Sequence, residues 1–208
     1  MKSSRTLLFG VLFAGAATLA HADLAYTFDT DAQGFTVDPS SGVLSHVAEG
    51  YLRVQDLTGE NNVSLQFPQA SLVGGWASYL GGKLSFDARL ESPITNAYWP
   101  EFGTVTLFGQ DGFATVDVAL GDEPGLGWQT YSVTLNPASF STTPAELSAV
   151  LASLQKVDIS LEAGNGPIEV IHVDNVKVTA VPEPATWAMA GLGVLAVAGS
   201  LGRRTARR

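Results

Sequence analysis

The chain of 208 residues contains no cysteine and only three histidines. Without cysteine it can form no disulfide bond and offers no thiolate as a nucleophile or metal ligand. His21 lies before the expected start of the mature domain, and His46 and His172 fall in separate predicted strands. Zinc needs three or four such ligands, and a Ser-His-Asp triad needs a base beside its nucleophile. We therefore expect no catalytic residues, no enzyme activity and no required cofactor.

Positive charge is also scarce between residues 23 and 180. This region holds five Lys and Arg residues against nineteen Asp and Glu residues, a net charge of −14. Such an acidic surface disfavours nucleic acid and anionic lipid as partners. It suits a protein that is soluble outside the cell, and it is compatible with binding of Ca²⁺.

The first 22 residues have the pattern of a secretory signal peptide. Lys2 and Arg5 form a basic start, residues 7–19 are apolar, and Ala20-His21-Ala22 fits an A-x-A cleavage site. We expect signal peptidase to cleave here, so that the mature chain begins at Asp23. The alternative is an uncleaved N-terminal anchor.

Residues 181–208 contain three elements in order. Pro182-Glu183-Pro184 interrupts regular structure, because proline lacks a backbone N–H. The uncharged apolar run 185–201 would be roughly 26 Å long as a helix, close to the thickness of a bilayer core, and it predicts a transmembrane helix. Cationic residues that resist translocation end the tail and would stay in the cytoplasm: Arg203, Arg204, Arg207 and Arg208.

This order of short motif, apolar helix and basic end resembles the PEP-CTERM sorting signal of Gram-negative bacteria. The resemblance implies that Pro182, Glu183 and Pro184 are the recognition motif and that an exosortase, a membrane protease-transpeptidase, processes the tail. It also implies an exported protein with an inner-membrane intermediate and a final place at the cell surface or in the extracellular matrix. The alternative is a surface protein whose tail is never cleaved and remains its anchor.

Residues 23–180 are expected to form one β-rich domain. In residues 83–90, apolar and polar side chains alternate with the period of a half-buried strand. One helix is predicted from Pro144 to Leu154, with Thr143 as N-cap and Glu146 completing a capping box. Many short strands with turn signals between them and one short helix predict an all-β, antiparallel sandwich.

Five segments of this domain resemble the laminin B module, also called laminin domain IV. They are Phe28-Asp29 with Gly34-Phe35, residues 82–87, residues 128–135, the helix with Leu151 and Leu154 followed by Val157-Asp158-Ile159, and Val173-Asp174-Asn175-Val176. The resemblance implies a jelly-roll of the galactose-binding-like type and a non-catalytic extracellular module. Eukaryotic members have cysteines in their surroundings and this chain has none, so their partner contacts are not carried over.

Calcium is the ligand that the resemblance favours, because jelly-roll carbohydrate modules often hold a structural Ca²⁺ between their first and last strands. Asp29 and Asp31 in the first loop and Asp174 in the last strand would supply carboxylate oxygens. The alternative is that Asp29 and Asp31 shape a turn and that Asp174 marks a bulge.

Polysaccharide is the second ligand class. Sugar binding needs aromatic faces with polar groups beside them, and Tyr79, Tyr98, Trp99 and Phe102 lie in or near predicted loops. Tyr98 and Trp99 are the candidate contacts, and the alternative is that these rings belong to the core. Acidic residues such as Asp158 and Glu162 alternate with apolar ones, so we expect them on the wet face of a strand and not as a catalytic pair.

Together these features predict an exported, non-catalytic surface protein with a structural or adhesive role in exopolysaccharide or biofilm. The alternative is a carbohydrate-binding, lectin-like module or a weakly carbohydrate-active one. Exosortase, signal peptidase, the membrane and polysaccharide are the expected partners.

Overall fold

The computed structural model describes residues 22–57, 62–94, 101–164 and 169–181. Nearly all of the predicted signal peptide and of the predicted sorting tail, including residues 185–201, lies outside these ranges. No helix within them has the length and hydropathy to span a membrane.

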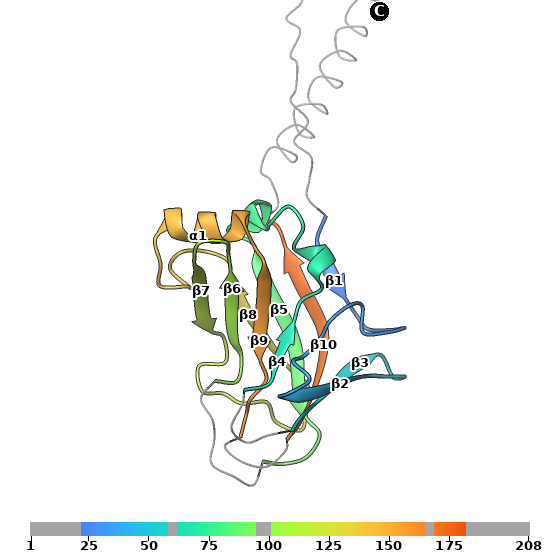
Figure 1. Ribbon diagram of the computed structural model, residues 1–208. Helices are drawn as coiled ribbons and strands as arrows, with labels where there is room; N and C mark the ends of the chain where they lie inside the picture. Colours follow the sequence, from blue (N-terminus) through green and yellow to red (C-terminus); the bar gives the residue numbers. More distant parts are fainter. Residues whose placement is uncertain (1–21, 58–61, 95–100, 165–168, 182–208) are drawn as a thin grey trace, which may run out of the picture.

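The described residues form two antiparallel sheets packed face to face (Figure 1). The larger sheet has the strand order β2-β3-β10-β5-β8, and β1 pairs with β10. Its strands are β1 (Leu24–Tyr26), β2 (Gly42–Val47), β3 (Tyr51–Asp56), β5 (Lys83–Leu90), β8 (Gln129–Thr134) and β10 (Val170–Thr179). The smaller sheet has the order β4-β9-β6-β7, with β4 (Ser64–Gln66), β9 (Lys156–Ser160), β6 (Thr104–Phe108) and β7 (Phe113–Asp117). The predicted antiparallel β-sandwich is confirmed.

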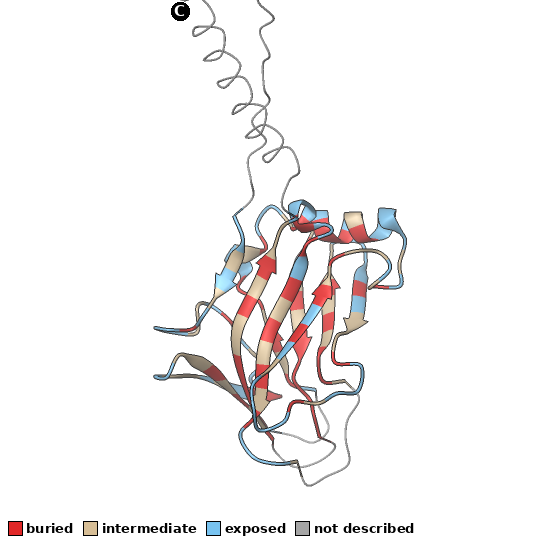
Figure 2. Cartoon of the chain, turned by 180° about the vertical axis from the view of Figure 1, so that it is seen from behind, coloured by how far each residue is buried: buried red, intermediate tan, exposed pale blue. Residues whose placement is uncertain are grey.

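The core lies between the two sheets and follows from the alternation along the strands. On β5, Leu84, Phe86 and Ala88 are completely buried, while the residues between them point outward. Phe86 stacks on Tyr131 of β8, with ring centroids 5.5 Å apart. Red and tan segments alternate along the same strands in Figure 2. Each large apolar side chain buried in this way contributes about 1.5–3 kcal/mol to folding.

The α-helix α1 (Pro144–Ala152) lies across one end of the smaller sheet (Figure 1). Its predicted capping box is confirmed, because the Thr143 hydroxyl accepts from the Glu146 N–H and the Glu146 carboxylate accepts from the Thr143 N–H. The helix ends at Ala152, two residues before the predicted end. Two 3₁₀ turns, η1 (Gln69–Ser71) and η2 (Ala77–Tyr79), connect β4 to β5, and η2 contacts α1.

Strand ends differ from the sequence prediction where side chains form local turns. The turn signal Gln110-Asp111-Gly112 predicts a hairpin whose second strand covers residues 113–120, but β7 ends at Asp117. The Asp117 carboxylate accepts hydrogen bonds from the N–H groups of Ala119 and Leu120, both at 2.9 Å, and this bends the chain away. The shared face of Tyr131, Val133 and Leu135 predicts a strand over residues 128–135, but β8 begins at Gln129 and Trp128 lies just before it.

The two ends of the sandwich domain meet at one pole. Leu24 of β1 pairs with Val178 of β10, and the Ala180 N–H donates to the Asp23 carboxylate at 3.0 Å. This pole is the one that carries α1 (Figure 1). The C-terminal tail therefore leaves the domain directly from β10, which lies between β3 and β5 in the larger sheet.

Candidate functional site

Six aromatic and charged side chains gather on the outer face of the larger sheet. Alternation turns them outward, since Leu52 and Val54 on β3 and Ala88 and Leu90 on β5 face the core. Strand register then brings them together, because His172 lies opposite Arg53 on one side and opposite Arg89 on the other. We name this group the sheet-face patch: Tyr51 and Arg53 on β3, Arg89 on β5, Glu91 just after β5, Trp128 just before β8, and His172 on β10.

Arg89 packs against two aromatic rings that also contact each other. Its guanidinium carbon lies 4.8 Å from the centre of the Trp128 ring and 5.4 Å from the centre of the Tyr51 ring. The two rings pack edge to face at 5.7 Å. Cation–π contacts of this kind orient the guanidinium without neutralising it. The Nε of Arg89 is buried and has no hydrogen-bond partner in the described part of the chain.

Glu91 is the anion of the patch and is bound by two neighbours. One oxygen accepts from Arg53 Nε at 2.7 Å and lies 2.9 Å from His172 Nε2, and the other accepts from the second guanidinium nitrogen at 3.2 Å. The hydrogen bonds from Arg53 and then from His172 lower the pKa of Glu91 to about 2. Glu91 is thus ionised at any physiological pH, and Arg53 is the cation that it neutralises.

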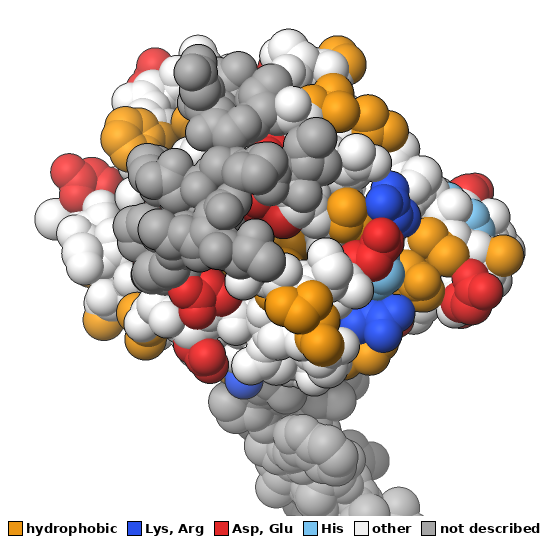
Figure 3. All heavy atoms as spheres, turned by 90° about the horizontal axis from the view of Figure 1, so that it is seen from below, with side chains coloured by type: hydrophobic (Ala, Val, Ile, Leu, Met, Phe, Trp, Pro, Cys, Tyr) orange, Lys and Arg blue, Asp and Glu red, His pale blue; other side chains and the backbone are white. Residues whose placement is uncertain are grey.

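The patch can hold a ligand that has an apolar face and oxygen atoms. Trp128 exposes 42% of its surface, and Tyr51 is half-buried beside it. His172 is almost fully buried under these rings, with the ring centres of Tyr51 and His172 4.7 Å apart, and its Nδ1 has no described partner. In Figure 3, blue, red and pale-blue side chains lie side by side on one flank with orange ones around them.

A second cluster consists of three carboxylates at the pole opposite α1. Asp56 ends β3, Glu162 follows β9 and Glu169 precedes β10, and one ligand oxygen from each lies within 4.8 Å of the others. Glu162 accepts from the Val63 N–H at 3.3 Å. Figure 3 views the molecule from this pole and shows red side chains beside the segments drawn in grey.

The acidic cluster corrects the sequence prediction for Glu162, whereas Asp158 keeps its predicted place between the buried Val157 and Ile159 of β9. Glu162 was expected on the wet face of a strand, but only 3% of it is exposed, because the chain has left β9 and turned into the end of the sandwich. Burial, followed by the charges of Glu169 and Asp56, raises its pKa to about 7. Asp158 is also largely covered, since β4 and β6 flank it in the sheet; burial raises its pKa, and it pairs with Lys156 at 2.6 Å.

The predicted calcium ligands, two in the loop after β1 and one in β10, have local hydrogen-bond partners. Asp31 accepts from the Gln33 N–H at 2.7 Å, and Asp29 accepts from the Thr27 hydroxyl at 2.5 Å. Burial raises the pKa of Asp174, and the charges of Asp87 and Asp29 raise it further. The strand register shifts after Asp174, as expected for a bulge. Calcium binding at Asp29, Asp31 and Asp174 stays a prediction.

The predicted glycan contacts fall into two groups. Tyr98 and Trp99 lie outside the described residues. Tyr79 and Phe102 are 2% and 1% exposed, so the idea that they contact a sugar is wrong, and the core alternative holds for them. Sequence reasoning missed the sheet-face patch, although Arg53 and Arg89 each occupy the polar position of an alternating strand.

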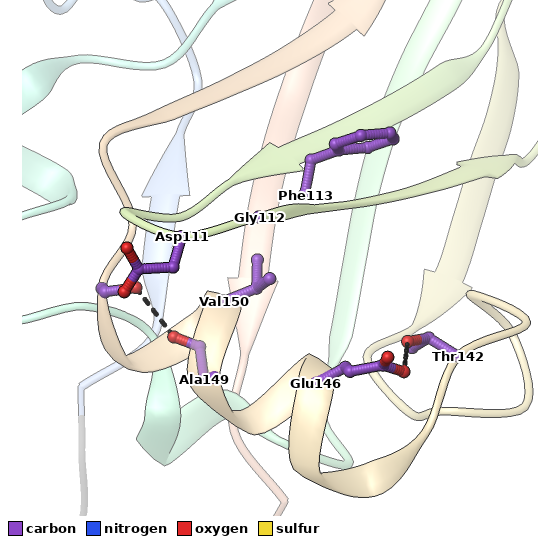
Figure 4. A pocket seen from close by; sticks show the side chains of 8 residues that line it. Asp111, Gly112, Phe113, Thr142, Glu146, Ala149 and Val150 are labelled. Carbon is purple, nitrogen blue, oxygen red and sulfur yellow. Dashed lines mark hydrogen bonds between the residues drawn. The ribbon is translucent and has the colours of Figure 1, made fainter.

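A hollow of about 570 Å³ lies between the β6–β7 turn and α1 (Figure 4). The polar side chains on the helix side of this hollow already form hydrogen bonds with the helix. Thr142 donates to Glu146 at 2.9 Å, and Ser153 donates to the Ala149 carbonyl at 2.8 Å. The remaining lining includes Asp111 and the exposed ring of Phe113. No set of polar groups converges there among the described residues.

Fold and patch together define the class: a jelly-roll β-sandwich module with an aromatic and charged sheet face. The L4b domain of human laminin alpha-2 is similar to it, with a TM-score of 0.54 and 10% identity over 77% of this chain and 98% of that domain. An exo-beta-agarase is similar with a TM-score of 0.50 and 11% identity over 76% of this chain, which spans 25% of the agarase chain. At these identities the likeness concerns the fold alone. No curated protein matches the sequence.

The particular feature of this chain is its tail. Residues 180–208 match the PEP-CTERM protein-sorting motif, which confirms the sequence prediction for the tail. The motif implies export, a membrane-associated sorting step and an exosortase as processing partner.

Proposed function

We propose that this protein is an exported, non-catalytic surface protein whose sandwich domain binds polysaccharide through the sheet-face patch. The observation that carries the proposal is the pair of rings, Tyr51 and Trp128, placed beside Arg89 on the outer face of a sheet. The flat faces of sugar rings stack on aromatic faces, and their hydroxyl groups need polar partners nearby. The similar solved structures share only the fold with this chain, so the side chains of the sheet-face patch are what supports polysaccharide binding.

Binding without turnover suits the groups that are present. In the patch, Glu91 is the one carboxylate, and it is ionised and bound by Arg53 and His172. A glycosidase of the usual kind needs a second carboxylate with a raised pKa facing the first across the substrate. Glu162 has a raised pKa, but it belongs to the cluster of Asp56 and Glu169 at the pole of the sandwich.

Alanine substitutions of the two rings test the proposal. With oligosaccharides derived from the exopolysaccharide of the host, Trp128→Ala and Tyr51→Ala are each expected to weaken binding at least tenfold in titration calorimetry, about 1.4 kcal/mol, because the stacking faces are lost. The matched control is Phe113→Ala, which removes an aromatic ring that is 67% exposed on the other sheet and should leave the affinity unchanged. Equal loss in all three variants, or no saturable binding by the wild type, would point to a structural role without sugar recognition.

The sorting route is the second part of the proposal. Signal peptidase would remove residues 1–22, the apolar run 185–201 would hold the chain in the inner membrane, and the terminal arginines would keep its end in the cytoplasm until an exosortase acts. The protein would then reach the cell surface or matrix and contribute to adhesion in the biofilm.

Replacing Pro182-Glu183-Pro184 by alanines is expected to stop processing. Intact-mass analysis of the native host should then find the tail still attached in the cell-bound fraction, whereas the unchanged protein begins at Asp23 and ends near residue 184. Arg207→Lys keeps the terminal charge and serves as the control, with normal processing expected. Unaltered processing of the alanine variant would refute recognition of this motif.

A further inference from the structure

We propose that the sheet-face patch selects an acidic polysaccharide, with Arg89 forming an ion pair with the carboxylate of a uronate-type sugar. This inference rests on the proposed function and names the ligand class of the same site. The two arginines of the patch differ in their ion pairing.

Arg89 is a cation without a counter-ion in the described structure. Arg53 is neutralised by Glu91, at 2.7 Å, whereas Arg89 forms no ion pair with any described carboxylate. Aromatic faces hold its guanidinium in place, and its Nε is buried without a partner. A positive charge that is oriented but not neutralised can gain a salt bridge from a ligand without first breaking one.

The chemistry of guanidinium favours a carboxylate. Its planar set of N–H donors matches the two oxygens of a carboxylate, and it keeps its charge at every physiological pH. Stacking on Tyr51 and Trp128 fixes the plane in which these donors lie. A sugar ring that stacks on Trp128, which is 42% exposed, brings a substituent on that ring next to Arg89.

The acidic groups near Arg89 are engaged elsewhere. Asp87 lies two residues away on the same face, where it accepts from the Thr130 hydroxyl at 2.6 Å and from the Asn175 amide at 2.9 Å. Asp174 accepts from the Asn175 N–H at 2.6 Å, and burial raises its pKa. In a domain with a net charge of −14, Arg89 is thus a position on this face where an anionic chain can approach.

The test compares two ligands that differ only at the carboxyl group, which is ionised in one and methyl-esterified in the other. Binding of oligogalacturonate and of its methyl ester is measured by titration calorimetry with the mature secreted protein, in low salt and in 0.5 M NaCl. We expect the acid to bind at least tenfold more tightly than the ester in low salt, and the difference to shrink in high salt, since ions screen exposed charge pairs. Arg89→Gln should remove the preference, so that acid and ester bind with equal affinity.

Two further variants separate charge from stacking and from folding. Arg89→Lys should retain only part of the preference, because an ammonium group lacks the planar donor set. Lys177→Gln makes the same change in net charge on β10, outside the patch, and should leave both affinities unaltered. Circular dichroism and melting temperatures are compared for all variants.

The outcomes distinguish this inference from the proposed function. If acid and ester bind equally well and Arg89→Gln changes neither, the inference is wrong while polysaccharide binding stands. If neither ligand nor any host polysaccharide binds, the proposed function fails as well. Tighter binding of a sulfated galactan than of oligogalacturonate would overturn the assignment to a carboxylate.

Discussion

Replacing Trp76 by alanine is expected to destabilise the domain by about 4 kcal/mol, the largest loss that we predict for a single side chain. Trp76 is completely buried between η1 and η2. Its ring packs against Phe67 at 5.2 Å, and its Nε1–H donates to the Ser71 carbonyl at 2.9 Å. Its backbone N–H donates to the Leu151 carbonyl of α1 at 2.6 Å. Truncation would leave a cavity at the junction of the helix and the sandwich, which urea unfolding of the mature domain would measure.

The neighbouring glycine shows how little space this junction leaves. Gly75 has φ +71°, a left-handed conformation that favours glycine. A Cβ at this position would lie 2.5 Å from the Leu151 carbonyl oxygen, so the chain around Trp76 cannot move toward α1 to fill a cavity. Trp128→Ala is the control, because Trp128 is 42% exposed, and it should cost about 1 kcal/mol or less. Similar losses for the two tryptophans would contradict the buried position of Trp76.

Glu162→Gln is expected to stabilise the domain at pH 8 and to flatten the dependence of its stability on pH. A carboxyl group whose pKa rises from 4.5 to about 7 on folding binds a proton more tightly in the native state. Its contribution is therefore most favourable at low pH and is lost as the pH rises from 4.5 through 7. Over that range the effect amounts to roughly 3 kcal/mol. Melting temperatures of wild type and variant between pH 5 and 8, with EDTA present, measure it.

Glu146→Gln provides the matched control for this titration. Hydrogen bonds from the Thr143 side chain and backbone lower the pKa of Glu146 below 4.5, so this group is ionised in both states between pH 6 and 8. Its substitution should shift stability by a constant amount over that window. Burial also raises the pKa of Glu169, so some pH dependence remains in Glu162→Gln. An unchanged pH profile in Glu162→Gln would mean that Glu162 does not titrate near neutrality, and stabilisation of the wild type by added Ca²⁺ would identify a cation as the reason.

The parts of the fold that sequence predicts are those that local chemistry determines. The capping box of Thr143 and Glu146 lies within four residues and needs no distant partner. The alternation on β5 reports burial directly, since every second side chain faces the core. The residue at which a strand ends is harder to predict, as Asp117 shows. A single carboxylate can accept hydrogen bonds from the N–H groups that would otherwise continue the pairing between strands.

The sites could not be predicted in the same way, because they arise from register between distant segments. His172 and Arg89 are 83 positions apart in the sequence, and only antiparallel pairing of β10 with β5 places them opposite each other. Glu162 looks like a strand residue on the wet face, yet it meets Asp56 from another sheet. The sorting tail, by contrast, could be predicted from the sequence, because the order of its elements along the chain defines the motif.

The position of β10 has a mechanical consequence. This strand carries His172 of the sheet-face patch near its start and leads into the tail at its end, with β3 and β5 hydrogen-bonded along its two sides. If a polymer bound at the patch pulled on a molecule tethered by its tail, as the proposed function implies, tension would run along β10 and load these ladders in shear. Many hydrogen bonds then resist together, whereas peeling would break them one at a time. A pull transmitted from the patch to the tail would thus act along β10, the direction in which its pairing with neighbouring strands resists most.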